Sequence, residues 1–248
     1  MHPTIAKIGP FVFHTYGLMV ATGVLLWLAI SLYFAKKEKI EAQTIFDLAI
    51  YVIIASVIGA RLFYVLGQPE YFRRHPFDII MVQNGGLVFL GGLILGLLSI
   101  IIFAKKYKLP LAKILDILTP GVIIGYALGR IGCFFNGCCF GLPTELPWGM
   151  AFPHDCLAGT FFPYSHIHPT QLYSSLIAFL IFGLLLWQYP RKSYDGQIFY
   201  WGIILYSIYR FLIEFIRFSP MHWFSLTPSQ WLSLVILVVV ILIFRQKK

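Results

Sequence analysis

The stretch FVFHTYGLMVATGVLLWLAISLYF, residues 11–34, contains no lysine, arginine, aspartate or glutamate. A helix needs about 20 predominantly apolar residues to cross the hydrocarbon core of a membrane, and this stretch is long enough. It is too long for the core of a signal peptide, and the KKEK that follows it lacks the small residues of a cleavage site. The sequence therefore predicts a first membrane-spanning helix that stays in the protein.

The same hydropathy pattern recurs along the rest of the chain. Of 248 residues, 59% are hydrophobic and 12% are charged, and the mean hydropathy is +0.80, which is the composition of a membrane protein. We therefore expect an all-α integral membrane protein with seven transmembrane helices in a single domain, residues 1–248. The expected spans are residues 11–34, 46–66, 86–104, 111–130, 171–188, 197–217 and 228–244.

Basic residues are unevenly distributed between the loops that these spans imply. Most of the 19 lysines and arginines lie in alternate segments, which are residues 35–45, 105–113, 189–196 and 245–248. Short basic loops resist translocation, so we expect a cytoplasmic C-terminus, an N-terminus outside, and outward loops at 67–85 and 131–170. The net charge of +9 is then explained by topology and by contact with anionic membrane lipids, and no nucleic-acid partner is expected.

Small residues recur every four positions in the fourth expected span. A stripe of this kind lets a second helix approach closely, so we expect close helix packing along it. A shorter stripe occurs in the third span at Gly92 and Gly96. The longer stripe consists of Gly121, Gly125, Gly129, Cys133 and Gly137.

Four arginines, Arg61, Arg130, Arg210 and Arg217, lie in or near the outer halves of the expected spans. An arginine inside a bilayer is costly and normally faces a cavity, a partner or a substrate. Glu214 shares a helix face with Arg210 and Arg217, but one carboxylate cannot balance this much positive charge. Because a guanidinium holds phosphate by two parallel hydrogen bonds, we expect a phospholipid headgroup here. For Arg61 and Arg217, snorkelling to lipid headgroups is an equally open alternative.

Several motifs, in order along nearly the whole chain, resemble the bacterial phosphatidylglycerol:prolipoprotein diacylglyceryl transferase family. The resemblance implies a seven-span enzyme of the bacterial cytoplasmic (inner) membrane, with its active site toward the outer leaflet. It implies transfer of a diacylglyceryl group from phosphatidylglycerol to the lipobox cysteine thiol of a prolipoprotein, with release of glycerol phosphate and without a cofactor. The motifs are FHTYGLMVATG (13–23), GARLFYVL (59–66), GGLVFLGGLILG (85–96), GRIGCFFNGCCFGLPT (129–144), HPTQLY (168–173), LYSIYRFLIEFIR (205–217) and LTPSQWLS (226–233).

The resemblance also implies roles for individual residues. Fixed guanidinium groups would stabilise the charge that develops on the departing phosphate monoester, a role we expect for Arg130 and Arg210. The implied catalytic residues are Arg210, Tyr16, Glu214 and Asn136. The resemblance implies a headgroup contact for Arg130, and we expect the substrate-binding residues to be Arg130, Arg61, Arg217, Gly91, Gly92 and Gly141.

The chain departs from the family's pattern where the acceptor thiol would be activated. The family phrase FHGG, whose histidine is the proposed base, reads FLGG at residues 89–92, and Leu90 cannot transfer a proton. Cys133 and Cys138 stand where the family usually has asparagine and glutamate. His14 and His168 are candidate replacement bases. Alternatively, the field of the arginines alone lowers the pKa of the substrate thiol.

The four cysteines, Cys133, Cys138, Cys139 and Cys156, fall in or next to the second outward loop, in a compartment that is oxidising in bacteria. A disulfide between Cys156 and Cys138 or Cys139 is one possibility. The simplest role for Cys133 is that of a small apolar side chain within the stripe. A zinc site lacks a recognised ligand spacing, so we expect no metal. Its ligands would have been His154, Cys156, His166 and His168.

Two other functions are compatible with the sequence. One is a family paralogue with an altered acceptor or without catalysis, which Leu90 favours. The other is a lipid or anion transporter, but transporters usually show internal repeats with broken helices, and none is visible.

Overall fold

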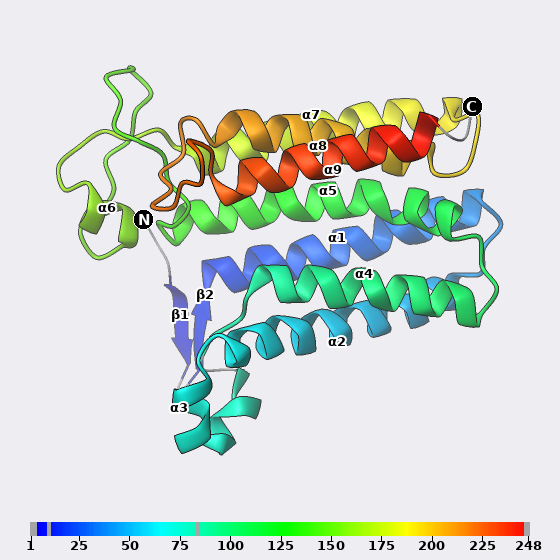
Figure 1. Ribbon diagram of the computed structural model, residues 1–248, viewed down its shortest axis with the longest axis horizontal. Coiled ribbons are helices and arrows are strands. Elements are labelled where there is room, and N and C mark those ends of the chain that lie inside the picture. Colours follow the sequence, from blue (N-terminus) through cyan, green and yellow to red (C-terminus); the bar gives the residue numbers. More distant parts are fainter. Residues whose placement is uncertain (1–3, 9–10, 83–84, 246–248) are drawn as a thin grey trace. The chain divides into compact units, whose positions relative to one another are not determined.

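The computed structural model describes residues 4–8, 11–82 and 85–245 and is mostly helical (Figure 1). Within these residues, five helices are long and apolar enough to cross a membrane, and α8 and α9 are apolar but shorter. A helical membrane protein is therefore confirmed, with a helix in each expected window. Residues 246–248, which contributed to the predicted orientation, lie outside the described part. The helices are α1 (Thr15–Lys37), α2 (Ala42–Leu66), α4 (Phe89–Lys106), α5 (Leu111–Phe135), α7 (Thr170–Gln188), α8 (Gln197–Ile213) and α9 (Pro228–Arg245).

The N-terminal segment forms a small antiparallel hairpin, which the sequence analysis did not anticipate. Strand β1 (Thr4–Ile8) pairs with β2 (Phe11–His14), and α1 begins at Thr15. The prediction that the first helix starts at residue 11 is therefore wrong. Aromatic and β-branched residues such as those in FVFH favour strands, and hydropathy alone does not separate a short apolar strand from a helix.

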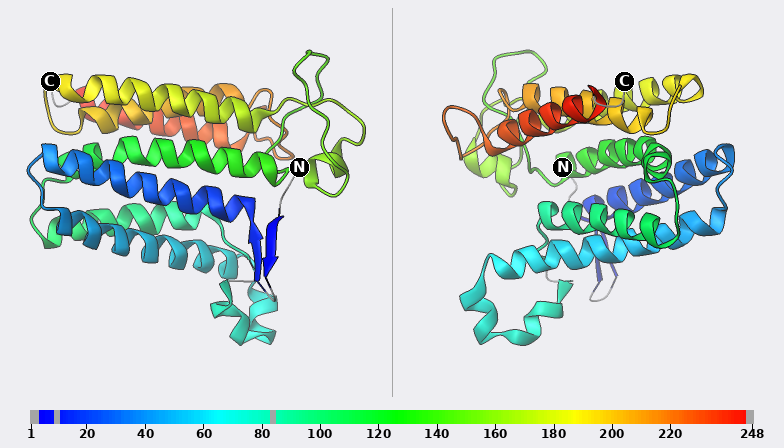
Figure 2. Two further views of the ribbon diagram at one scale, coloured as in Figure 1. Left: turned by 180° about the vertical axis from the view of Figure 1, so that it is seen from behind. Right: turned by 45° about the vertical axis from the view of Figure 1, so that its right-hand side comes forward.

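The chain divides into two compact units whose boundaries fall inside α1 and α5. The first unit comprises residues 1–31 and 115–248, and the second comprises residues 32–114. In the first unit, α7 packs against α8, and α8 packs against α9 (Figures 1 and 2). The second unit consists mainly of the α2–α4 pair and the short helices α3 (Pro69–Arg74) and η1 (Pro76–Ile80).

Glycines allow α2 and α4 to touch backbone to backbone. A Cβ atom on Gly59 would lie 2.3 Å from the carbonyl oxygen of Gly91, and one on Gly91 would lie 2.3 Å from the carbonyl oxygen of Gly59. Added Cβ atoms on Gly92 and Gly96 would lie 3.0 Å and 2.6 Å from oxygen atoms of Ser56. The predicted close packing at Gly92 and Gly96 is confirmed.

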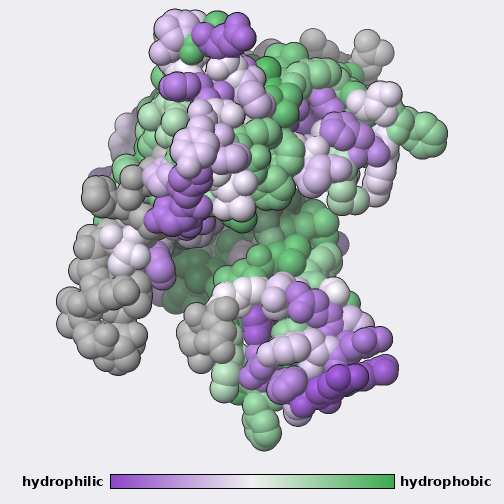
Figure 3. Space-filling model, turned by 90° about the vertical axis from the view of Figure 1, so that its left-hand side faces the viewer, coloured by the Kyte–Doolittle hydropathy of each residue, from purple (hydrophilic) through white to green (hydrophobic). Residues whose placement is uncertain are grey.

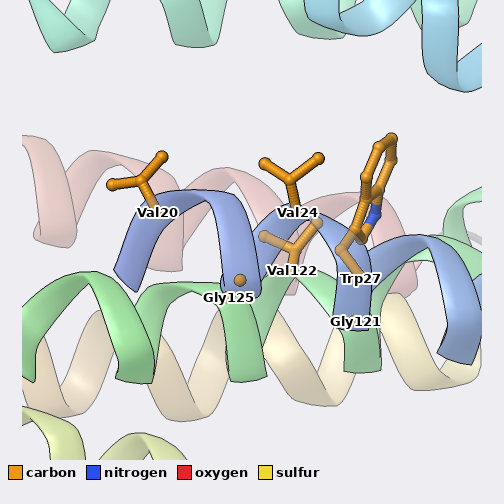
Figure 4. A pocket seen from close by; sticks show the side chains of 7 residues that line it. Val20, Val24, Trp27, Gly121, Val122 and Gly125 are labelled. Carbon is orange, nitrogen blue, oxygen red and sulfur yellow. The ribbon is translucent and has the colours of Figure 1, made fainter. Parts of the chain in front are cut away.

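The longer small-residue stripe of α5 packs partly against α1. Added Cβ atoms on Gly121 and Gly125 would lie 2.8 Å from Trp27 and 3.4 Å from Gly23, whereas one on Gly129 would have no neighbour within 4 Å. A shallow apolar cavity of about 190 Å³ lies along this contact, lined by glycines, valines and Trp27 (Figure 4). Without a charged side chain in its lining, it is a feature of the helix packing and lies apart from the arginines.

Asp116, near the start of α5, supports the first turn of α8. It is fully buried, and its two oxygens accept hydrogen bonds from the backbone amides of Gly196 (2.8 Å) and Phe199 (2.9 Å). Lys192 Nζ lies 3.4 Å from the same carboxylate. Helix N-termini leave amides without partners, and a negative charge there is favourable, so Asp116 caps α8 from another helix.

Replacing Asp116 with asparagine should lower the free energy of unfolding by about 1–3 kcal/mol, because buried amides and Lys192 lose a charged partner. Thermal unfolding of the detergent-solubilised protein measures this effect. Asp195→Asn is the matched control, because Asp195 binds the same lysine but is exposed. Equal unfolding temperatures for the two variants would contradict the capping role.

Candidate active site

Helix α5 ends in the sequence CFFNGCC, residues 133–139, through a turn that depends on glycine. Gly137 adopts a left-handed conformation (φ +65°), and its amide donates to Phe134 O at 3.1 Å. The amide of Cys138 donates to Cys133 O at 3.2 Å. These two bonds define a Schellman motif, in which the residue after the glycine lies over the last turn of the helix. The motif therefore brings Cys138 next to Cys133. It also extends α5 five residues beyond the predicted end at residue 130.

The start of α7 holds the backbone of this turn. Thr170 Oγ1 donates to Cys139 O at 2.9 Å, and Gln171 Nε2 donates to Cys138 O at 2.7 Å. Both side chains are buried, so these bonds are protected from water. The amide of Ala158, in α6 (Leu157–Phe161), donates to Gly137 O at 3.0 Å. The HPTQLY motif thus positions the CFFNGCC turn.

The loop that follows α5 has a hydrophobic core of its own. Its centre is formed by Phe140, Phe152, Ala158 and Ile167, which are all buried. The loop and the start of α7 lie at one end of the first unit (Figures 1 and 2), and that end exposes many hydrophilic residues (Figure 3). An ordered loop of this kind can fix the positions of functional side chains.

Three thiols gather at the turn. The Sγ atoms of Cys133, Cys138 and Cys139 all lie within 4.8 Å of one another, and the three residues are half-buried. Contact with the Cys133 and Cys138 thiols, together with the positive charges of Arg217 and Arg130, lowers the pKa of the Cys139 thiol. We call this cluster the thiol triad.

Arg130 lies one turn before the triad on α5. Its guanidinium stacks over the ring of Tyr126, 4.7 Å from the centroid, and the Tyr126 hydroxyl lies 3.0 Å from the Tyr209 hydroxyl of α8. In the described part of the chain, Arg130 forms no ion pair with a carboxylate. Both Arg130 and Arg210 interact electrostatically with Tyr126 and Tyr206. The two arginines thus approach the same tyrosines from different helices.

Glu214, directly after α8, binds two arginines through one oxygen. Arg210 Nη1 donates to Glu214 Oε2, and Arg217 Nη1 lies 3.4 Å from the same atom. Arg210 Nη2 also donates to Ser229 Oγ of α9 at 2.8 Å. The Glu214 side chain is 2% exposed, and Arg217 Nε is buried without a hydrogen-bond partner in the described structure. The group carries one net positive charge and an unused donor, which suits an anionic ligand.

Tyr16 and Asn136 border the thiol triad. Tyr16, in the first turn of α1, packs on Gly132 of α5, where an added Cβ atom would lie 3.1 Å from Tyr16 Cδ2. It interacts electrostatically with all three cysteines and with Arg130. Asn136 is exposed, directly follows α5, and interacts electrostatically with Cys138. Six of the predicted site residues therefore surround one region of the first unit: Tyr16, Arg130, Asn136, Arg210, Glu214 and Arg217.

Gly141 lies where three backbone segments meet. Its amide donates to His168 O at 3.0 Å, and an added Cβ atom would lie 2.7 Å from Ile216 O, so a side chain cannot fit. The half-buried His168 has its Nδ1 atom 3.4 Å from the Tyr173 hydroxyl. His14 ends β2 and is exposed. Neither the substrate role of Gly141 nor the proton-transfer roles of the histidines are tested by these contacts, so they stay predictions.

Arg61, Gly91 and Gly92 belong to the second unit. In the described structure, the Arg61 guanidinium donates all its hydrogen bonds to the backbone carbonyls of Asp78, Ile79, Gly85 and Gly86. Gly91 and Gly92 pack on α2, and Leu90, in the same turn, is 45% exposed. These contacts give Arg61 and the glycines structural roles, and their roles in substrate binding stay predictions.

The sequence did not predict the thiol triad. Within the described residues it is the one group of three or more His, Cys, Asp or Glu side chains close enough to hold a metal ion. His154, Cys156, His166 and His168 do not form such a group. All four cysteines are free, and Cys156 Sγ donates to Pro153 O at 3.1 Å. Gly137, four residues after Cys133 and directly before Cys138, was the available signal, because a glycine at this position predicts a Schellman turn that brings the two cysteines together.

Comparison with known proteins identifies the family of this chain. A family described as prolipoprotein diacylglyceryl transferase matches residues 3–245. Three relatives named phosphatidylglycerol–prolipoprotein diacylglyceryl transferase are similar along most of their length. The Finegoldia magna protein is 36% identical over 235 residues, covering 94% of this chain and 91% of that protein. The Nostoc sp. protein is 34% identical over 238 residues, covering 94% of this chain and 84% of that protein. The Clostridium tetani protein is 33% identical over 246 residues, covering 99% of this chain and 97% of that protein. The chain belongs to the prolipoprotein diacylglyceryl transferase family.

Proposed function

We propose that this protein transfers the diacylglyceryl group of phosphatidylglycerol to the lipobox cysteine thiol of a prolipoprotein. The observation that supports this most strongly is the convergence of Arg130 and Arg210 on Tyr126 and Tyr206. Arg217 joins them through Glu214, which also binds Arg210. The excess positive charge there suits the phosphate of an anionic lipid, and the family membership names the reaction.

In this reaction the acceptor sulfur forms a bond to the terminal glyceryl carbon of the diacylglycerol moiety. The bond from that carbon to the phosphate oxygen breaks, and its electron pair leaves with glycerol phosphate. The thiol proton is lost to solvent. The phosphate changes from a singly charged diester to a monoester with additional charge, so guanidinium groups aimed at its oxygens favour the transition state over the bound substrate.

Arg130 and Arg210 are the residues to which we assign this stabilisation. The charge of Arg130 is more available to an anionic ligand than that of Arg210, because no carboxylate binds Arg130 in the described structure. Glu214 orients Arg210 and Arg217, and the unpartnered Nε of Arg217 offers a further donor to the headgroup. Tyr16 and Asn136 border the same region and would contact the reacting groups.

All seven apolar helices would cross a bacterial cytoplasmic membrane, with the N-terminus outside. The basic residues support this orientation, because α1 and α4 end in Lys36, Lys37, Lys105 and Lys106, which would face the cytoplasm. The shorter helix α8 has 17 residues, a length of about 26 Å, which is close to the thickness of the hydrocarbon core. The opposite ends of the helices carry Tyr16, Arg130 and Arg210, so the active site would open toward the outer leaflet.

The test is transfer in vesicles of defined lipid. The purified protein is reconstituted into vesicles containing phosphatidylglycerol labelled in its acyl chains, and a lipobox peptide is added. Mass spectrometry should show the peptide with diacylglycerol in thioether linkage, and a peptide with serine for cysteine should remain unmodified. Lipid or anion flux without a covalent product would indicate a transporter instead. Failure to restore lipoprotein maturation in a transferase-depleted strain would indicate a different acceptor.

A further inference from the structure

We propose that the thiol triad binds a Zn²⁺ ion through the sulfurs of Cys133, Cys138 and Cys139, and that the acceptor cysteine thiol becomes the fourth ligand. The metal site stands on its own geometry. The role of the acceptor thiol rests on the proposed function.

The spacing of the sulfurs fits a tetrahedral thiolate site. With Zn–S bonds of about 2.3 Å, ligand sulfurs lie roughly 3.8 Å apart. The three Sγ atoms already lie within 4.8 Å of one another, so small side-chain movements complete the geometry. Carboxylates and carbonyls are absent from this ligand set, and soft thiolates select a thiophilic ion over magnesium or calcium.

The backbone around the triad is fixed before any ligand arrives. The Schellman turn fixes Cys138 relative to Cys133, and buried Gln171 and Thr170 hold the carbonyls of Cys138 and Cys139. Cys139 itself has φ +62°, a left-handed conformation that is uncommon for a residue other than glycine. Backbone strain of this kind is concentrated at functional sites, where the surrounding structure maintains it.

The coordination number points to a catalytic site. Structural zinc sites usually have four protein ligands, whereas catalytic sites have three and leave a position for water or substrate. In the described part of the chain, no fourth His, Cys, Asp or Glu side chain joins the triad. The thiol of Cys156, in the loop that follows α5, donates a hydrogen bond to Pro153 O instead. The fourth position is thus available to an external thiol.

The surrounding charge is complementary. Three thiolates and Zn²⁺ together carry one negative charge, and both Arg130 and Arg217 interact electrostatically with Cys139. The guanidinium groups would therefore favour the metal-loaded triad, and they would lie next to the region where the phosphate departs.

Zinc would supply the acceptor thiolate that the reaction needs. A thiol that coordinates a metal ion loses its proton to solvent and keeps nucleophilic character at sulfur. The sulfur then attacks the glyceryl carbon, the carbon–oxygen bond breaks, and zinc undergoes no change in oxidation state. Glu214 is a poor alternative base because two arginines bind its carboxylate. Leu90, in the FLGG segment, cannot accept a proton.

The metal site is tested without any activity measurement. The reduced protein is loaded with Zn²⁺, freed of excess metal, and analysed by mass spectrometry of its metal content, and we expect about one zinc per chain. Co²⁺ in place of zinc should give a thiolate-to-cobalt charge-transfer band in the near ultraviolet. Cys138→Ser should weaken metal affinity on the order of a hundredfold, one ligand's share of a thiolate zinc site. Cys156→Ser is the matched control and should bind zinc with the affinity of the unaltered protein. The inference is overturned if the chain binds no zinc, or if Cys138→Ser and Cys156→Ser bind it equally well.

The acceptor role is tested on the cobalt-loaded protein. A lipobox peptide should shift the charge-transfer band, and the same peptide with serine for cysteine should not. Metal removal should then lower diacylglyceryl transfer, and zinc should restore it. An unchanged cobalt spectrum, or equal transfer with and without metal, would overturn the acceptor role and leave the proposed function intact. A band shift without transfer under any condition would instead overturn the proposed function and retain the metal site.

Discussion

Replacing Arg130 with alanine should lower the rate of diacylglyceryl transfer at least 100-fold, about the loss seen when one donor to a developing oxyanion is removed. In the described structure, the Arg130 guanidinium has an aromatic face as its neighbour and no carboxylate, so its charge is available to a ligand. Without it, the departing phosphate gains charge in a weakly polar region with one fewer cation. The measurement is the turnover number for transfer from labelled phosphatidylglycerol to a lipobox peptide.

Arg191 provides the control for this substitution. It also stacks on an aromatic ring four residues earlier in the chain, with its guanidinium 4.5 Å from the Trp187 ring centroid. It lies in η3 (Tyr189–Arg191), in a segment predicted to face the cytoplasm. Arg191→Ala therefore removes the same kind of contact and should leave the turnover number within about twofold, because such surface contacts are worth little. Arg130→Lys should recover part of the rate, since lysine keeps the charge without the planar fork. Equal rates for Arg130→Ala and Arg191→Ala would exclude the role assigned to Arg130.

The helices could be predicted from hydropathy because a membrane imposes one length on every apolar span. The errors lie at the ends, where local chemistry decides. Residues 11–14 are apolar enough for a span but pair as a strand, and α5 continues to Phe135 because Gly137 provides the turn that ends it. Hydropathy windows contain no information on either feature.

The charged part of the candidate site followed from the sequence, whereas the thiol part did not. Glu214 is four residues after Arg210, and helix periodicity brings such residues together. The predicted helix face does not extend to Arg217, because α8 ends at Ile213 and Arg217 reaches Glu214 through the turns that follow the helix. The triad needs Cys139 as well as the turn, and its position depends on hydrogen bonds from Thr170 and Gln171 more than thirty residues later in the chain. Contacts of that range cannot be inferred from the spacing of cysteines alone.

Arg61→Leu should destabilise the second unit by about 3 kcal/mol or more, because hydrogen bonds to charged groups are worth about 1.5–3 kcal/mol each. Arg61 is 8% exposed, and its guanidinium donates to the carbonyls of Asp78, Ile79 (2.9 Å), Gly85 (2.6 Å) and Gly86 (3.1 Å). These residues lie near both ends of the segment 78–86, in the connection between α2 and α4, so one side chain holds the two ends of that segment together. The leucine variant leaves these carbonyls without their donor and cannot form the stacking on Tyr64 and Phe72.

Thermal unfolding and limited proteolysis of the 67–88 connection measure this loss. Arg74→Leu is the matched control, because Arg74 lies in the same connection but is exposed, and its unfolding temperature should stay close to that of the unaltered protein. Arg61→Lys should resemble Arg61→Leu, since an ammonium group cannot span carbonyls at both ends of the loop as the guanidinium fork does. If Arg61→Leu instead unfolds normally and raises only the KM for phosphatidylglycerol, then Arg61 binds the lipid headgroup, and the carbonyl contacts contribute little to the stability of the loop.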